Sequence, residues 1–327
     1  MSTGLGPMPG TDPGESASVV LGELGEAPHH PFLAQLPARG PGADPTGRAG
    51  ALLVDLALDL QPSGWRFTDH PGRDQFRART FLRNDLDALA EAADGFTGDL
   101  VVPVPGPWSL LAAVELPRGE RSVIDPGARR DVTESLAVGI ETHLADVARL
   151  VPGASRTVLL EEPSLSAVLE GRLPTASGYG SLRAVDAAEV RQGLRTVVEA
   201  VCRSGATPVL RLAPDGPFAL AREAGAAGVA VDVTHVEDAG WESLATGIEA
   251  GVTLWAGVVP VDRRPPVGDV VRVLEQRWRR LGLVLPSLAD VVVTPVGGLQ
   301  RLDPATVRSF LGRLREVQDA TTEVAQG

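Results

Sequence analysis

Two adjacent glutamates stand at the end of an apolar run, where carboxylates can serve as acid, base or ligand anchor. The stretch VLLEEP carries Glu161 and Glu162, and Pro163 ends the pattern. Side chains alternate between the two faces of a β-strand, so the two carboxylates must point in opposite directions. We expect one to face a pocket and the other to anchor a loop or an arginine. The competing interpretation is a solvated strand end, where both acids meet water.

Polar residues follow other apolar runs in the same way. Arg211 lies in the run near 207–212, and Asp232 in the run near 228–233. We assign Glu162, Arg211 and Asp232 as candidate catalytic residues, because together they supply both signs of charge to one pocket. The candidate substrate-binding residues are Glu161, Trp108, Ser109, His235, Asp262 and Gly297. Such a pocket suits a small zwitterionic or carboxylate ligand.

Several of these residues also have a plainer interpretation. An arginine within an apolar run is often paired with a nearby acid, and Asp232 is a suitable partner for Arg211. His235 fits a surface position or a helix cap equally well. Trp108 fits ordinary packing at the rim, and Asp262 fits a solvated turn.

Metal chemistry has little support from the residues. The single cysteine, Cys202, excludes a cysteine-based zinc site and a disulfide within the chain. Apart from the adjacent pair His29 and His30, no two histidines have ligand spacing on one helix. That pair lies within residues 23–32, which we interpret as a plain loop, with a lid over the pocket as the alternative. The chain has no lysine, which excludes Schiff-base chemistry and a phosphate-loop lysine.

Short apolar runs alternate with helical patterns along the chain. Strand-like runs lie near 3–6, 31–36, 99–104, 156–161, 207–212, 228–233, 252–259 and 290–295. Helical patterns lie near 13–24, 45–59, 74–93, 128–149, 186–203, 215–225, 238–250, 266–281 and 304–319. This alternation predicts an α/β fold, and eight strand candidates predict a closed (β/α)8 TIM barrel. Active sites of such barrels lie at the C-terminal ends of the strands, where the candidate residues fall.

A doubly wound open sheet is the alternative architecture. It would carry a glycine fingerprint after the first strand, but GLGPMPG has the spacing GxGxxxG and two interrupting prolines. No linker rich in Gly, Ser and Pro divides the alternating region. We therefore expect one TIM-barrel domain over residues 1–327, with residues 1–2 and 321–327 flexible.

Composition narrows the classes of partner. The chain has 30 basic and 42 acidic residues, a formal charge of −12, and no basic cluster, so we exclude nucleic acid as the main ligand. No run of 18 apolar residues is present, which argues against membrane insertion, and the first residues lack the pattern of a signal peptide. With one cysteine, we expect a cytoplasmic location. No feature of the sequence indicates an oligomeric state.

Several stretches resemble the C-terminal barrel of cobalamin-independent methionine synthase, within the wider uroporphyrinogen decarboxylase-like superfamily. LLEEPSLSAVLEGRLP is similar to the family's strand-four segment, and VTPVGGLQR to its turn after strand eight. GPMPGTDP is similar to the family's opening Gly-Ser-Phe-Pro turn, and VPVPGPWSLL to its Gly-Pro turn after strand three. The resemblance covers residues 3–320 in order and implies a single barrel without the additional N-terminal barrel of the full-length enzymes.

The resemblance also implies a zinc site whose sulfur and nitrogen ligands this chain lacks. The family binds zinc through His-x-Cys, a glutamate and a distant cysteine, and zinc lowers the pKa of the homocysteine thiol. The His-x-Cys positions fall on Arg211 and Ala213, and the distant cysteine falls on Gly297. Without these ligands, we expect no zinc and no metal activation of a thiol.

The remaining family positions are acids in this chain. The family's glutamate after strand six falls on Asp232, and a histidine after strand seven falls on Asp262. The acid after strand four is kept as Glu161 or Glu162. In this interpretation the guanidinium of Arg211 stands in place of the metal. It would hold a carboxylate, or stabilise a thiolate or enolate.

The resemblance implies a methionine-synthase-like methyltransferase, with a folate-type donor and a thiol acceptor such as homocysteine, built on a degenerate, zinc-free site. No resident cofactor is expected, and the ligand would be amino-acid-like or folate-like. Two alternatives stay open. One is a metal-free lyase or decarboxylase, in which Arg211, Arg263 and Arg264 clamp substrate carboxylates. The other is a protein that binds a small ligand without catalysis.

Overall fold

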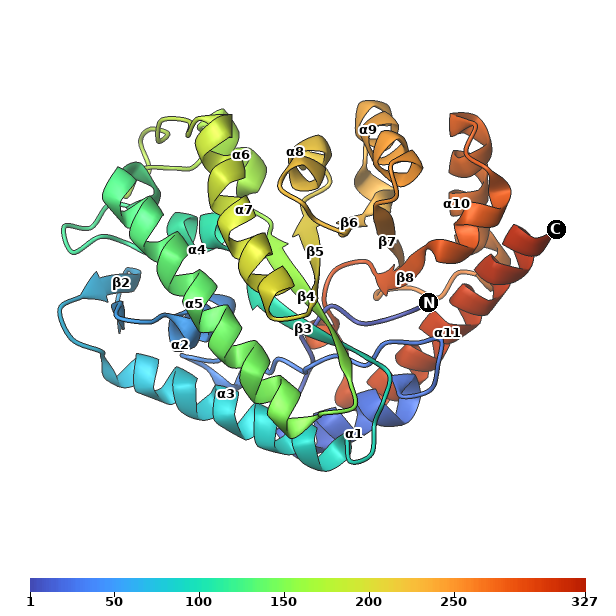
Figure 1. Ribbon diagram of the computed structural model, residues 1–327, viewed down its shortest axis with the longest axis horizontal. Coiled ribbons are helices and arrows are strands. Elements are labelled where there is room, and N and C mark those ends of the chain that lie inside the picture. Colours follow the sequence, from blue (N-terminus) through green and yellow to red (C-terminus); the bar gives the residue numbers. More distant parts are fainter.

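A parallel sheet curls around the centre of the protein, and helices cover its outside (Figure 1). This computed structural model describes residues 1–327. The six regular parallel strands pair in sequence order and are β3 (Asp99–Pro105), β4 (Ser155–Glu162), β5 (Thr207–Leu212), β6 (Gly228–Asp232), β7 (Thr253–Val259) and β8 (Val292–Pro295). These strands match the last six strand-like runs of the sequence.

Two N-terminal segments close this sheet into a barrel. Ser2 pairs in parallel with Val293 of β8, and Phe32 pairs in parallel with Val101 of β3. Backbone hydrogen bonds of 3.1 Å from Thr3 to Val293 and 2.9 Å from Leu33 to Val101 hold these two seams. The predicted (β/α)8 barrel is therefore confirmed, with segments 2–8 and 30–35 in the places of the first two strands.

These two closing segments form isolated bridges instead of long strands. They meet each other where Pro7 pairs with Gln35. Proline lacks the backbone N–H that a regular strand ladder needs, and the segments contain Pro7 and Pro31. The barrel is therefore closed by few backbone hydrogen bonds at this side, and buried side chains must supply much of the closure.

Eleven α-helices accompany the strands. They are α1 (Pro13–Leu24), α2 (Pro45–Leu52), α3 (Arg73–Ala92), α4 (Pro107–Ala113), α5 (Pro126–Leu150), α6 (Leu165–Glu170), α7 (Ala187–Arg203), α8 (Phe218–Glu223), α9 (Asp238–Glu249), α10 (Val267–Leu281) and α11 (Pro304–Gln326). Four of them begin with Asp-Pro, in which the aspartate caps the first amides and proline occupies the first turn: α1, α2, α5 and α11. Each helix is too short or too polar to pass through a lipid bilayer.

Two regions differ from the sequence-based expectation. The helix expected over 45–59 ends at Leu52, and the chain continues into an antiparallel hairpin of β1 (Ala57–Gln61) and β2 (Gly64–Thr68). The hairpin turn uses Gly64 at a φ of 136°, a conformation that favours glycine. The ends of the chain, expected to be flexible, have regular contacts: Ser2 lies in the barrel seam and α11 continues to Gln326.

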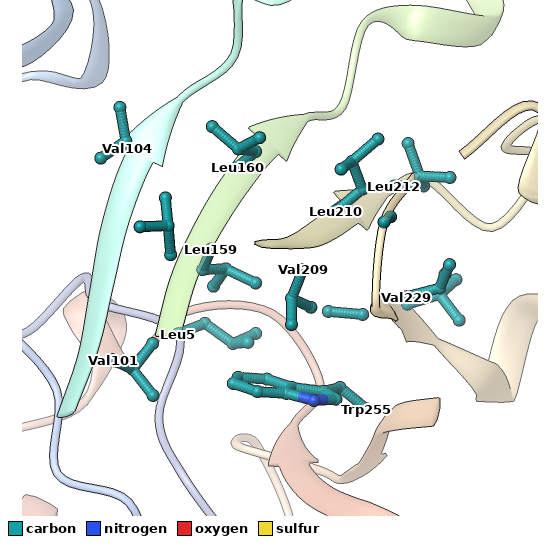
Figure 2. Close-up of a cluster of buried hydrophobic side chains, with 14 of the residues drawn as sticks. Leu5, Val101, Val104, Leu159, Leu160, Val209, Leu210, Leu212, Val229 and Trp255 are labelled. Carbon is teal, nitrogen blue, oxygen red and sulfur yellow. The ribbon is translucent and has the colours of Figure 1, made fainter. Parts of the chain in front are cut away.

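Alternating side chains fill the lower interior of the barrel. Leu159 of β4 and Val209 of β5 are paired in register and lie near Trp255 of β7 and Leu5 (Figure 2). Trp255 pairs in register with Ala230, so a large side chain stands beside a small one. The next inward position on β4 and on β5 is polar, and a cavity begins at that level.

Phe32→Ala tests the importance of the seam that lacks a full strand. The Phe32 ring is fully buried, and a side chain at Gly4 would collide with it. We expect the variant to lose about 3–5 kcal/mol of unfolding free energy in urea titrations, because truncation leaves a cavity. Phe76→Ala is the matched control, since Phe76 is 57% exposed, and it should cost less than about 1 kcal/mol. Equal losses in both variants would contradict a packed seam.

Candidate active site at the C-terminal end of the barrel

A cavity of about 590 Å³ opens at the C-terminal ends of the strands. Five of the residues singled out from the sequence line this cavity: Ser109, Glu161, Arg211, Asp232 and Gly297. The parallel register explains this, because Glu161 pairs with Arg211 and Arg211 with Ala230, two residues before Asp232. Glu161 and Arg211 thus lie at one level of the inward face, and Asp232 lies one inward position further toward the C-terminal end of its strand.

An ion pair between Glu161 and Arg211 is the main charged feature of the cavity. Arg211 Nη1 donates to Glu161 Oε1 at 2.6 Å, and the two side chains are 26% and 12% exposed. Partial removal from water strengthens this attraction compared with a surface pair. A guanidinium has five N–H donors, so Arg211 keeps donors for a ligand while it holds Glu161. The partner we expected for Arg211, Asp232, makes no ion pair with it.

Glu162 points the opposite way and is fully buried outside the barrel. Its carboxylate accepts the backbone N–H groups of Trp108 at 2.9 Å and Ser109 at 2.7 Å, at the start of α4. A side chain at Gly106 would collide with this carboxylate, which explains the glycine before Pro107. Burial raises the pKa of Glu162 to about 7, although the hydrogen bonds from Trp108 and Ser109 favour its charged form.

This placement corrects the catalytic assignment of Glu162. One carboxylate faces the pocket and the other anchors a loop, as alternation requires, but the inward residue is Glu161. Both faces of β4 are covered, so the apolar run gives no indication of which face is inward. Glu162 therefore holds the wall of the cavity and does not contact its interior.

Trp108 also lies outside the cavity. Its side chain is 1% exposed, and its indole N–H donates to the backbone carbonyl of Val190 in α7 at 3.1 Å. The ring packs against Gly193, where a side chain would leave no room. The ligand-binding role predicted for Trp108 is thus replaced by packing of α4 against α7. Ser109, next in sequence, does reach the cavity, and its hydroxyl accepts the N–H of Ser164 at 3.1 Å.

Asp232 lies at the rim of the cavity and also caps a turn. Its carboxylate accepts the N–H of Thr234 at 3.1 Å and contacts Nδ1 of His235 at 2.8 Å. His235 itself is 69% exposed and does not line the cavity. Asp262 is exposed in the turn after β7 and likewise lies outside, so the binding roles expected for these two residues do not fit their positions.

Four polar lining residues were not singled out from the sequence: Thr46, Ser164, Thr294 and Gln300. Ser164 and Gln300 follow the same strand ends as Glu161 and Gly297, so strand-end position was a usable signal for both. Thr294 lies inside an apolar strand, and Thr46 belongs to α2. Their approach to the cavity depends on how the barrel closes.

The paired histidines lie at the other end of the barrel. His30 donates its backbone N–H to Ser2, and Pro31 accepts from Val101, near the beginning of β3. Since the cavity opens at the opposite strand ends, residues 23–32 do not cover it. The plain-loop interpretation fits this position, and the lid does not.

The residues of the cavity do not fit the zinc site that the sequence resemblance implies. No group of three or more His, Cys, Asp or Glu side chains lies close enough to hold a metal ion. The positions of the family's sulfur and nitrogen ligands carry a guanidinium at Arg211 and a bare backbone at Gly297. A fixed cation next to Glu161 opposes the binding of a divalent metal there.

Comparisons with known proteins define the fold. No protein-family model and no curated protein matches the sequence. A B12-independent methionine synthase from Shewanella sp. W3-18-1, solved in complex with selenomethionine, is 10% identical, with 82% of this chain and 74% of that chain covered and a TM-score of 0.52. A 2,3-dimethylmalate lyase of the PEP mutase/isocitrate lyase superfamily is 13% identical, with coverages of 99% and 93% and a TM-score of 0.40. The likeness to the methionine synthase, at this identity, shows the fold alone.

Glu162→Gln tests the anchoring role through the pH dependence of stability. Because the folded pKa of Glu162 is raised above the unfolded value of about 4.3, the folded state keeps its proton where the unfolded state has lost it. The contribution of Glu162 to stability is therefore present at acid pH and is lost as pH rises toward about 7. The glutamine variant lacks this titration.

The measurement is urea unfolding of both proteins between pH 4.5 and 8. At the acid end we expect the variant to be less stable than the unsubstituted protein by about 1–2 kcal/mol. The NH2 group of the glutamine is a donor and cannot accept one of the two backbone N–H groups that both oxygens of Glu162 accept. The difference between the two proteins should shrink as pH rises. A constant difference across this range would contradict a raised pKa, and no difference at any pH would contradict the anchoring role.

Proposed function

We propose that the barrel cavity binds a small amino-acid-like ligand and that the chain is a methionine-synthase-like protein whose site operates without zinc. The observation that carries this proposal is the Glu161–Arg211 ion pair inside the cavity, with the Asp232 carboxylate at its rim. A ligand carboxylate would take the free N–H donors of Arg211, and a ligand ammonium would take Glu161 or Asp232.

The charge balance of the cavity favours a ligand with both signs of charge. Glu161, Arg211 and Asp232 are its only charged lining residues, so the lining carries a net charge of −1. A zwitterion can exchange partners with the existing ion pair: its ammonium replaces the guanidinium at Glu161 while its carboxylate replaces Glu161 at Arg211. A ligand with carboxylates alone would have to leave Glu161 without a cation, which costs free energy in a partly buried site.

Methyl transfer is the reaction class that the sequence resemblance favours. The B12-independent methionine synthase was solved with selenomethionine, an amino acid, and its likeness to this chain supports the same fold. A thiol such as homocysteine would be the acceptor and a folate-type molecule the donor. The lyase alternative receives less support, because Arg263 and Arg264 are exposed and lie outside the cavity.

Arg211→Gln tests the carboxylate-binding role. We expect this variant to bind methionine about tenfold or more weakly in calorimetric titrations, because a charge-assisted hydrogen bond is lost. Arg263→Gln is the control, because Arg263 has no ion-pair partner and lies outside the cavity. The affinity of this variant for methionine should stay within about twofold of that of the unsubstituted protein. Unchanged affinity in Arg211→Gln would exclude Arg211 as the carboxylate site.

The second experiment addresses zinc. Purified protein should contain far less than one zinc per chain, and added zinc should not stimulate methyl transfer from methyltetrahydrofolate to homocysteine, since the site lacks thiolate and imidazole ligands. Elemental analysis and a methionine-formation assay measure both. Stoichiometric zinc with zinc-dependent turnover would overturn the zinc-free site, while metal-independent turnover would support an enzyme over a binding protein.

A further inference from the structure

A second cavity, of about 710 Å³, lies on the outside of the barrel between α2, α3 and α5. Figure 1 shows α3 and α5 side by side, with α2 next to them. This groove shares no lining residue with the barrel cavity. Apolar side chains make up much of its wall: Leu52, Leu53, Leu82, Leu86 and Leu150. It is therefore a separate concave site with an apolar interior.

A buried histidine without a hydrogen-bond partner lies in this groove. His143 of α5 is 4% exposed, and its pKa is lowered to about 4 by burial and by the charge of Arg48. No protein group forms a hydrogen bond with its imidazole. One turn earlier, Gly139 allows α5 to touch the carbonyl of Leu52, where a side chain would collide. The ring nitrogens are not among the fully buried polar atoms without a partner, so they reach the open groove and can hydrogen-bond with a ligand there.

Two unpaired arginines line the same groove. Arg79 and Arg83 are one turn apart on α3, and neither has a carboxylate within ion-pair distance. The third arginine of the groove, Arg149, is paired with Asp146 at 3.1 Å. Two adjacent guanidinium groups that hold no carboxylate in an ion pair can both donate hydrogen bonds to one anion.

Two unpaired acids limit the charge of the ligand. Asp55 and Asp87 also line the groove, so its charged residues sum to zero. Because the groove has no net positive charge, a second negative charge on the ligand would be removed from water without a net attraction to offset that cost, so a monoanion is favoured over a dianion such as a phosphate monoester. We propose that this groove binds a small organic acid with one negative charge, with its apolar body on the leucines, its acid group at Arg79 and Arg83, and a hydrogen bond to His143.

The α2 helix connects this groove with the barrel cavity. Pro45 and Thr46 at its start line the barrel cavity, and Leu52 at its end lines the groove. The two cavities nevertheless have different charged residues, so substitutions can address each one separately. The inference about the groove does not depend on the function proposed for the barrel.

The test uses 8-anilino-1-naphthalenesulfonate, a fluorescent monoanion with an aromatic body, titrated into the folded full-length protein. We expect binding that weakens about tenfold in Arg79→Gln/Arg83→Gln. The matched control, Arg118→Gln/Arg183→Gln, removes two exposed arginines that have no ion-pair partner and should change affinity less than about twofold.

Thr142→Trp should block the groove, because Thr142 is exposed on its wall. Displacement of the dye by decanoate or by 1-naphthoate then shows whether a chain or a ring fits better.

His143→Leu distinguishes a ligand-binding role from a structural one. If His143 serves a ligand, the leucine variant should keep a similar melting temperature without dye and bind the dye about tenfold more weakly, whereas a structural role would lower the melting temperature. Three results would overturn the proposal: no dye binding, dye binding unaffected by both the arginine pair and Thr142→Trp, or dye binding lost in Arg211→Gln, which would place the dye in the barrel.

Discussion

The opposite directions of two adjacent carboxylates at the end of β4 determine how the barrel site is built. Glu161 turns inward and pairs with Arg211, while Glu162 turns outward and accepts the first amides of α4. One residue therefore sets the charge of the cavity and the other fixes the wall beside it. A shift of β4 by one residue would bring one glutamate into the other's place, so that, depending on its direction, either Arg211 would lose its acid or the α4 amides would lose their acceptor.

The ion pair also determines what the cavity can bind. Arg211 carries a permanent charge, so any ligand carboxylate must compete with Glu161 for it. An amino-acid-like ligand meets this condition because it brings an ammonium to compensate Glu161. The thiolate and imidazole ligands that hold zinc in the family that the sequence resembles have no counterpart around Arg211. Binding by exchange of ion pairs is therefore the chemistry that these residues support.

Much of the architecture could be predicted from the sequence, and much of the detail around the site could not. Continuous apolar runs are local signals, so the last six strands were predicted within a few residues. The short helices α4 and α6 and the hairpin of β1 and β2 were not predicted, and the C-terminal ends of α2 and α11 were predicted wrongly. The orientation of Glu161 was not predictable, because β4 is covered on both faces and its run has no alternation. The role of Trp108 required knowing that α4 packs on α7. The outer groove depends on three helices separated in sequence, and only their packing brings His143 into one groove with Arg79 and Arg83.

A crystal structure with bound methionine would test the central claim most directly, namely that Arg211 points into the barrel and holds a ligand carboxylate. We expect density for the ligand in the barrel cavity, with its carboxylate within hydrogen-bond distance of Arg211 and its ammonium near Glu161 or Asp232. A methionine bound elsewhere, an Arg211 side chain turned away from the cavity, or a metal ion between Glu161 and the end of β5 would contradict it.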